Sequence, residues 1–281
     1  MSQTSRLTNR HIAWVLLASV PILAFLVLNA NSDIDPQTIA PEQHFYIVSI
    51  SSLVCFALAG TGVAAAIRTR DPRISLISAG FLAMAGVFAI HGLSTPGYLV
   101  DGRYFAVTGF SARTAVWLGA LFLFLSALPM PRLAGQAIVR ARIPAFGVTA
   151  ALVVGWAIAA LGFPERMPPR VISAEWFIDG TLVTVLLFGA VSIVAYLRLY
   201  RQTGLAAYGA IAVGSALIVE TQISMHYGQL WNWSWWLYHL QLLGAFVTML
   251  WFPFALRRSE AVDGSAAFEV DVTAELQRDA A

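Results

Sequence analysis

Eight apolar runs, each long enough to cross a bilayer as a helix, constrain the fold of this chain more than any other feature. They extend approximately over 12–30, 45–67, 75–94, 112–131, 145–163, 177–197, 205–225 and 234–256. A hydrocarbon core about 30 Å thick requires about 20 mostly apolar residues per helix. The sequence therefore predicts an all-α polytopic membrane protein, a bundle of eight transmembrane helices.

The composition excludes several other classes of protein. Apolar side chains make up 58% of the 281 residues and charged ones 11%, whereas soluble domains are about 45–50% apolar and about 25% charged. This balance excludes a soluble enzyme and a disordered chain. We expect no nucleic-acid partner, because the chain has no basic stripe. A single cysteine, Cys55, excludes an intramolecular disulfide framework and a cysteine-rich metal site.

The positions of the arginines predict the orientation in the membrane. All 17 cationic residues are arginine, and most lie before the first run, after the last run or in the even-numbered connections. Cytoplasmic loops retain positive charge, so we expect both termini to be cytoplasmic, in a bacterial inner membrane. The predicted organisation is a cytoplasmic N-terminus (1–11), a membrane domain (12–256) and an acidic cytoplasmic tail (257–281). The first run is longer than the usual signal-peptide core of about 7–15 residues, so we expect it to be retained rather than cleaved.

Ionisable side chains at membrane depth are rare and mark functional sites, and here they gather in the predicted outer leaflet. The candidates for ligand or metal binding are His91, Glu220, His226 and His239. A second set is placed at the periphery of the same pocket: His44, Asp179, Tyr238 and Gln241. For His44 and His226, which lie close to the interface, the alternative interpretation is ordinary hydration.

Three chemistries fit such a set of residues. Converging imidazoles and carboxylates can bind Zn²⁺ or a copper ion. Two facing histidines can ligate a b-type haem, for which His91 and His239 are the pair to test. A ligand or proton pocket needs only the protected carboxylate of Glu220 with histidine partners. The alternative is that His91 and His239 each form a hydrogen bond to a neighbouring helix and hold no ligand.

The tryptophans at 231, 233, 235 and 236 are open to two interpretations. They are typical of an interfacial aromatic belt, or they cover a pocket. The chain contains no His-Glu-x-x-His, phosphate-binding glycine loop or Gly-x-Ser-x-Gly elbow, so no catalytic residue is identified.

Three short stretches carry a resemblance to a known class of membrane region. They are His44-Phe45-Tyr46, the segment HGLSTPG at 91–97, and the segment SWWLYH at 234–239. Together they resemble the multi-pass N-terminal membrane region found ahead of cyclase, HD-type phosphodiesterase or kinase modules in bacterial signalling proteins. The resemblance covers residues 11–258. It implies a sensory input module whose signal is received by a separate cytoplasmic signalling protein.

The leading hypothesis is a sensor-like or ligand-binding membrane module with a His/Glu-lined pocket in the outer leaflet. The alternative is a metal-dependent membrane enzyme or b-haem redox protein that uses the same residues. A transporter is the third hypothesis, disfavoured because no polar residues form a path through the inner leaflet. The sequence names neither the ligand nor the oligomeric state.

Overall fold

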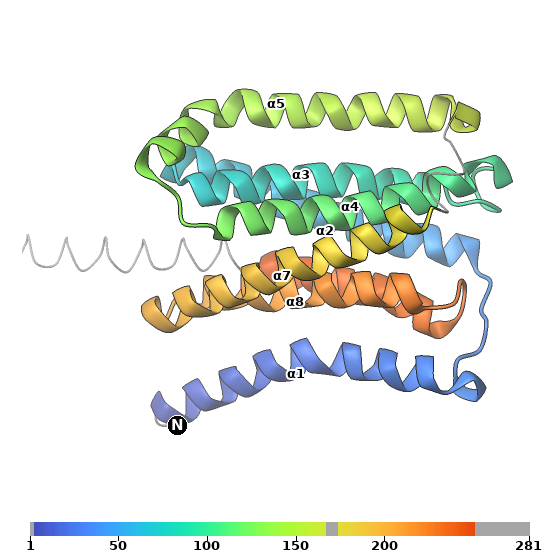
Figure 1. Cartoon of the computed structure of the whole chain (residues 1–281), viewed down its shortest axis with the longest axis horizontal. Helices are drawn as coiled ribbons and strands as arrows, with labels where there is room; N and C mark the ends of the chain where they lie inside the picture. Colours follow the sequence, from blue (N-terminus) through green and yellow to red (C-terminus); the bar gives the residue numbers. More distant parts are fainter. Residues whose placement is uncertain (1–2, 167–173, 251–281) are drawn as a thin grey trace, which may run out of the picture.

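The chain folds into a bundle of long helices (Figure 1). The computed structural model describes residues 3–166 and 174–250, with side chains from Trp14 onward. The helices are α1 (Gln3–Ala30), α2 (Pro41–Thr69), α3 (Pro72–Leu93), α4 (Phe105–Ala127), α5 (Arg132–Gly162), α7 (Glu175–Thr203) and α8 (Ala206–Tyr227). A further helix occupies 233–250, and the described ranges contain no β-strand. The all-α prediction is confirmed.

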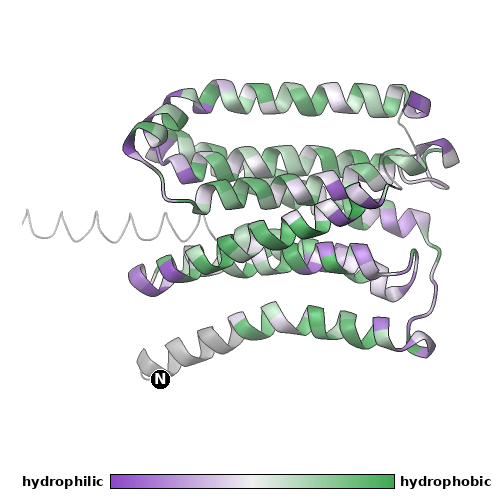
Figure 2. Cartoon of the chain, in the orientation of Figure 1, coloured by the Kyte–Doolittle hydropathy of each residue, from purple (hydrophilic) through white to green (hydrophobic). Residues whose placement is uncertain are grey.

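Six helices are long and apolar enough to cross a membrane: α2, α3, α4 with the turn before it, α5, α7 and α8. The apolar stretch of α1, Trp14–Ala30, is shorter. Figure 2 shows the hydrophobic residues along the middle of the helices and the hydrophilic ones at their ends. This pattern fits a multi-pass membrane protein.

Several helices extend beyond the apolar runs. Helix α5 begins at Arg132 and continues through Pro144, whereas its apolar run begins near residue 145. Helix α4 begins at Phe105 and ends at Ala127, so both of its predicted ends were wrong by several residues. A count of apolar residues locates the part of a helix that fits the hydrocarbon, and polar turns can extend that helix into the headgroup region.

Local signals explain the tight connection between α2 and α3. Helix α2 ends at Thr69, and the next residue, Arg70, adopts the left-handed conformation with φ of 54°. The carboxylate of Asp71 then caps α3 by accepting hydrogen bonds from the backbone N–H of Arg73 and Ile74, at 2.7 and 3.1 Å. Pro72 occupies the first turn, where its missing N–H is not needed. These signals make α2 and α3 an antiparallel pair.

Helix α3 lies at the centre of the bundle. It packs against α2, α4 and α5, and its apolar stretch is the most buried of the six candidate spans, while that of α5 is the least buried. Helix α7 packs against α4 and α8, and α1 packs against α8. In Figure 1, α5 and α1 are accordingly at opposite edges.

Small residues allow close contacts between these helices. A Cβ atom on Gly86 would meet Val153 of α5, one on Gly80 would meet Phe122 of α4, and one on Gly62 would meet Ser78 of α3. Gly60 has open space around it, so it is no contact point within the bundle.

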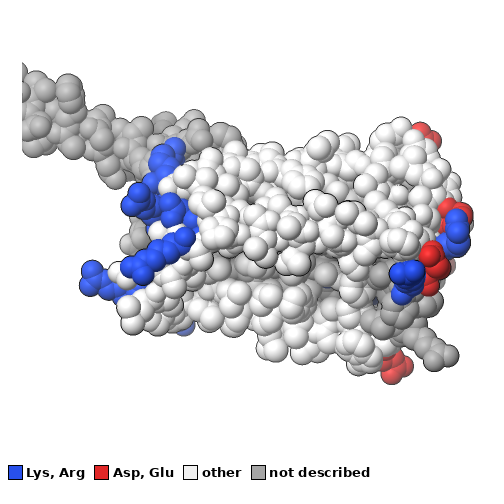
Figure 3. Space-filling model, turned by 90° about the horizontal axis from the view of Figure 1, so that it is seen from above, with Lys and Arg blue, Asp and Glu red and all other residues white. Residues whose placement is uncertain are grey.

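The charged residues separate between the two ends of the bundle. On the face shown in Figure 3, the blue arginines cluster at one end, while the acidic residues and a few arginines occupy the other. The predicted acidic tail 257–281, Arg170 and the last residues of the eighth run lie outside the described residues.

Candidate metal centre

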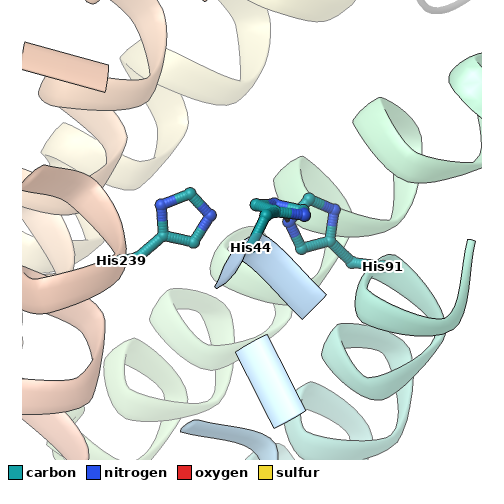
Figure 4. A group of neighbouring side chains, drawn as sticks. All are labelled: His44, His91 and His239. Carbon is teal, nitrogen blue, oxygen red and sulfur yellow. Dashed lines mark hydrogen bonds between the residues drawn. The ribbon is translucent and has the colours of Figure 1, made fainter. Parts of the chain in front are cut away.

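Three histidines from three different helices converge inside one end of the bundle (Figure 4). His44 comes from α2, His91 from α3 and His239 from the 233–250 helix. All three are at most 2% exposed. One ring nitrogen of each lies within 4.8 Å of the corresponding nitrogens of the other two. We call these residues the His triad.

Hydrogen bonds fix the tautomer of two of the rings directly. Nδ1 of His91 lies 2.9 Å from the backbone oxygen of Thr108, and Nδ1 of His239 lies 3.3 Å from that of Trp236. A carbonyl oxygen can only accept, so each Nδ1 carries a proton and donates it. In a neutral imidazole the proton on Nδ1 leaves a lone pair on Nε2.

The tautomer of His44 follows from its partner, Thr95. Nδ1 of His44 lies 2.8 Å from the Thr95 hydroxyl, and that hydroxyl donates its proton to the backbone oxygen of Gly92, at 2.7 Å. Since the hydroxyl proton is used, Thr95 accepts from His44, which therefore also carries its proton on Nδ1. All three neutral rings thus direct a lone pair from Nε2.

The lone pairs in the His triad are poorly satisfied by the protein itself. Nε2 of His44 and Nε2 of His91 are 3.2 Å apart, and two acceptors at this distance repel unless a cation lies between them. The Tyr238 hydroxyl lies 3.1 Å from Nε2 of His91 and can donate to it. Nε2 of His239 is buried and has no partner among the described residues. An unsatisfied buried acceptor costs about 1–3 kcal/mol.

The spacing of these nitrogens is close to that of a metal site. Zinc binds imidazole nitrogen at about 2.0–2.1 Å in tetrahedral geometry, which places ligand nitrogens about 3.3 Å apart. The His44 and His91 nitrogens already have this separation. A pair at the 4.8 Å limit would close by about 1.5 Å.

Aromatic side chains hold the three imidazoles in place. Trp235 stacks on His44 with ring centroids 5.4 Å apart, and Tyr238 stacks on His239 at 3.7 Å. Phe88 stacks on His91 at 5.1 Å. These rings exclude water from the His triad and restrict the orientations of its members.

The aromatic cover is itself fixed by the segment that follows α1. The buried carboxylate of Asp35 accepts from the backbone N–H of Ser234 at 2.7 Å and from the Ser234 hydroxyl at 2.6 Å. It also accepts from the side-chain amide of Asn232 at 3.3 Å. Thr38 donates its N–H to the backbone oxygen of Trp231, at 2.7 Å, and accepts from the Trp236 indole at 3.0 Å. We call this set of bonds the Asp35 clamp.

The structure brings together some of the predicted site residues and separates others. His91, His239 and Tyr238 meet at the His triad. His226 instead faces Asp179 of α7, at 3.8 Å. Within the described ranges no hydrogen bond, ion pair or ring contact joins Glu220, Gln241, His226 or Asp179 to the triad. Among the described residues, both predicted carboxylates, Glu220 and Asp179, thus lack a contact with the triad.

His44 is not peripheral, contrary to the sequence analysis. It lies between His91 and His239 in Figure 4, and its ring centroid is 4.8 Å from both of theirs. Helix α2 begins at Pro41 rather than at residue 45, so His44 lies inside the helix and faces the core instead of the loop. A proline with Glu42 directly after it is a helix-start signal that identifies this register.

A haem between His91 and His239 does not fit this arrangement. Their ring centroids are 6.1 Å apart and their planes are 18° from parallel, so the two rings face each other. However, the His44 ring is 4.8 Å from each and therefore lies beside their midpoint, where the porphyrin would have to pass. The residues present suit a single metal ion and not a haem.

The sequence analysis missed Asp35, Thr95 and Thr108, whose bonds orient the triad and its cover. The four tryptophans at 231–236 do not all share one role: some cover the pocket, and one has the exposure expected of an interfacial belt. Trp231, Trp235 and Trp236 each contact His44, while Trp233 is 52% exposed.

Comparison with protein-family models, with curated proteins and with solved structures gives no match. The chemistry of the site therefore carries the functional argument: the chain is an apolar helical bundle whose buried triad of histidines could hold a metal ion.

Proposed function

We propose that this protein is a multi-pass membrane module that binds one metal ion, Zn²⁺ or a copper ion, through His44, His91 and His239. The observation that carries this proposal is that Nδ1 of each ring lies within hydrogen-bond distance of an oxygen acceptor, which places the proton on Nδ1 and the lone pair on Nε2. Metal-binding histidines donate their second ring N–H in this way, which fixes the ring and raises its basicity. Hydrogen bonding between helices alone does not account for Nε2 of His239, which is buried and has no partner among the described residues.

In the proposed topology eight helices cross a bacterial inner membrane and both termini are cytoplasmic. The arginine-rich end, with Arg68, Arg132 and Arg201 at helix ends, faces the cytoplasm under the positive-inside rule. The His triad lies at the opposite end and hence in the outer leaflet. Helix α1 and the 233–250 helix supply the two spans beyond the six that are long and apolar enough.

The same module is proposed to act as a sensor. The three ligands come from α2, α3 and the 233–250 helix, so a bound metal would join helices that can otherwise shift relative to one another. A metal changes the population of two helix packings only if it binds one of them more tightly. The resemblance to membrane input regions supports this role, with a separate cytoplasmic signalling protein as the receiver.

Metal content tests the binding proposal. The wild-type protein, purified after growth with added zinc or copper, is expected to contain about one equivalent of metal. The triple variant His44→Ala/His91→Ala/His239→Ala is expected to contain none. His226→Ala is the matched control, because it removes an outer histidine that does not touch the triad, and it should keep the metal. A wild-type protein without metal, or a triple variant with it, contradicts the proposal.

Hydrogen exchange tests the sensor role separately. Addition of metal is expected to change exchange at the arginine-rich helix ends, near Arg73 and Arg201, in the wild type and not in the triple variant. If exchange changes only around the His triad, metal binding stands and sensing fails.

A metal-dependent membrane enzyme is the second candidate function. Three histidines leave a fourth position open on a tetrahedral ion, as in catalytic zinc sites. The buried side chains of Glu220 and Gln241, which keep atoms without partners among the described residues, would provide polar groups for a substrate. A cobalt-loaded protein whose visible spectrum responds to added anions would favour this candidate over a closed site.

A further inference from the structure

A groove at the arginine-rich end of the bundle is not used by the proposed metal site. It lies between the start of α3, the end of α4 and the last turns of α7, and its volume is about 620 Å³. Its wall is apolar and includes Leu128, Val191 and Val194, and two cations, Arg73 and Arg198, line it as well. We call it the inner groove.

The lengths of the helices explain why the groove exists. Helix α4 ends at Ala127, and the chain leaves it through Leu128 and Pro129. Helix α7 continues to Thr203, so its last turns extend past the end of α4. The floor beside the groove is fixed by a 2.6 Å hydrogen bond between the buried hydroxyls of Ser126 and Tyr196. The groove is therefore part of the packed structure.

The charge of the groove is unbalanced. Its lining contains two arginines and Gln202, and no carboxylate. Neither Arg73 nor Arg198 donates a side-chain hydrogen bond or forms an ion pair within the part of the chain that the structure describes. Two arginines from different helices thus line one apolar hollow, and none of the described residues that line it with them is acidic. Asp71, two positions before Arg73, uses its carboxylate to cap α3.

Phosphodiester oxygens suit such a pair of guanidinium groups, which recognise phosphate through forked N–H donors. The valines on the wall are 41% and 48% exposed at positions 191 and 194, which suits an acyl chain. Basic pockets between transmembrane helices on the cytoplasmic side bind anionic lipid headgroups. The volume lies within the range of about 300–1,000 Å³ that is typical of ligand sites.

We propose that the inner groove binds one anionic phospholipid of the cytoplasmic leaflet, with its phosphate between Arg73 and Arg198 and part of an acyl chain along Val191 and Val194. A lipid with a cationic headgroup is disfavoured, because its ammonium would face two arginines. This site rests on the proposed membrane orientation and is independent of the metal.

Native mass spectrometry can test this proposal. Wild-type protein in a neutral detergent receives equal amounts of phosphatidylglycerol and phosphatidylcholine with the same acyl chains. We expect the wild type to retain one phosphatidylglycerol preferentially. In the variant Arg73→Gln/Arg198→Gln the preference for phosphatidylglycerol should fall about 30-fold, since each of the two arginines contributes about 1 kcal/mol and every 1.4 kcal/mol is tenfold.

Two controls separate the groove from the general charge of this end. Arg132→Gln/Arg140→Gln removes two arginines of α5 that do not line the groove, and it should keep the preference. Val194→Trp fills the groove while both of its arginines remain, and it should reduce the bound phosphatidylglycerol.

Equal binding of the two lipids to the wild type overturns the proposal, as does an equal loss in the α5 control. Displacement of the lipid by glycerol 3-phosphate at the same concentration also overturns it, because the site would then bind a free phosphate. The triad's metal content, measured on the same samples, shows whether the metal proposal fails separately. If Arg73→Gln/Arg198→Gln does not fold, Val194→Trp alone decides the outcome.

Discussion

Replacement of Asp35 tests whether the Asp35 clamp holds the His triad in place. Its carboxylate is 6% exposed and accepts three hydrogen bonds from Asn232 and Ser234, at 2.6–3.3 Å. One of them satisfies a backbone N–H at the start of the 233–250 helix, where orphan donors need a partner. Asp35→Ala removes all three.

The size of the effect follows from these bonds. A hydrogen bond to a charged group contributes about 1.5–3 kcal/mol, and the loss of a helix cap about 0.5–2 kcal/mol. Because the three bonds share one carboxylate and are not additive, we expect Asp35→Ala to lower the free energy of unfolding by about 3–5 kcal/mol. For a chain of this size that is a fall of about 10 °C in the thermal midpoint.

The clamp also positions Trp235 and His239, so metal affinity should fall as well. Outer-shell substitutions lower metal affinity about 10–100-fold, and we expect about tenfold here. Intrinsic tryptophan fluorescence gives the midpoint, and competition with a chelator gives the affinity. The control Asp33→Ala removes an exposed carboxylate of the same segment. If Asp35→Ala unfolds and binds metal as Asp33→Ala does, the clamp has no role in the site.

Three further substitutions test other parts of the account. Tyr238→Phe removes the hydroxyl that competes for Nε2 of His91, so chelator competition should show metal affinity that is unchanged or a few-fold higher; a large loss would make Tyr238 a ligand. Glu220 has a buried carboxylate oxygen without a partner among the described residues. Glu220→Gln should therefore raise the free energy of unfolding by about 1–3 kcal/mol, measured as a higher thermal midpoint, whereas a lower midpoint would indicate that the carboxylate has an essential partner. Gly86→Ala places a methyl group against Val153 and should lower the free energy of unfolding by about 1–3 kcal/mol. The double variant Gly86→Ala/Val153→Ala should recover part of this loss. The control Gly155→Ala adds its methyl group in open space and should not be destabilising.

The sequence predicts the helical class and the approximate positions of the helices well, because each depends on a local property. Apolar runs of about 20 residues locate the helices, and arginines and prolines mark their ends. The exact ends were less accurate. The polar first turns of α5, which contain Arg140 and Arg142, are helical although no apolar run includes them.

The sequence also predicts at which end of the bundle a residue lies, but it does not predict which residues of other helices are its neighbours. His91 and His239 were assigned to one end of the bundle, and the structure places them there. The same reasoning placed Glu220 and His226 in the pocket, and His226 in fact faces Asp179. Helix rotation and the order of packing decide such contacts, and a single sequence does not contain them.

The groups that orient the His triad were the hardest to predict from the sequence. Asp35 acts across almost 200 positions of sequence separation, and Thr108 acts through its backbone oxygen. Neither interaction can be predicted from residue type or from the spacing of residues in the sequence. The tautomers of the three histidines, on which the proposed metal site depends, follow from these hydrogen-bond partners and therefore require the structure.

X-ray absorption spectroscopy of the metal-loaded protein tests the central claim most directly. A metal on His44, His91 and His239 predicts three nitrogen scatterers at about 2.0–2.1 Å, with the outer-shell scattering of imidazole rings, lost in the triple alanine variant and kept in His226→Ala. A spectrum dominated by oxygen ligands without imidazole scattering, or an unchanged spectrum in the triple variant, would contradict the claim that the His triad binds the metal.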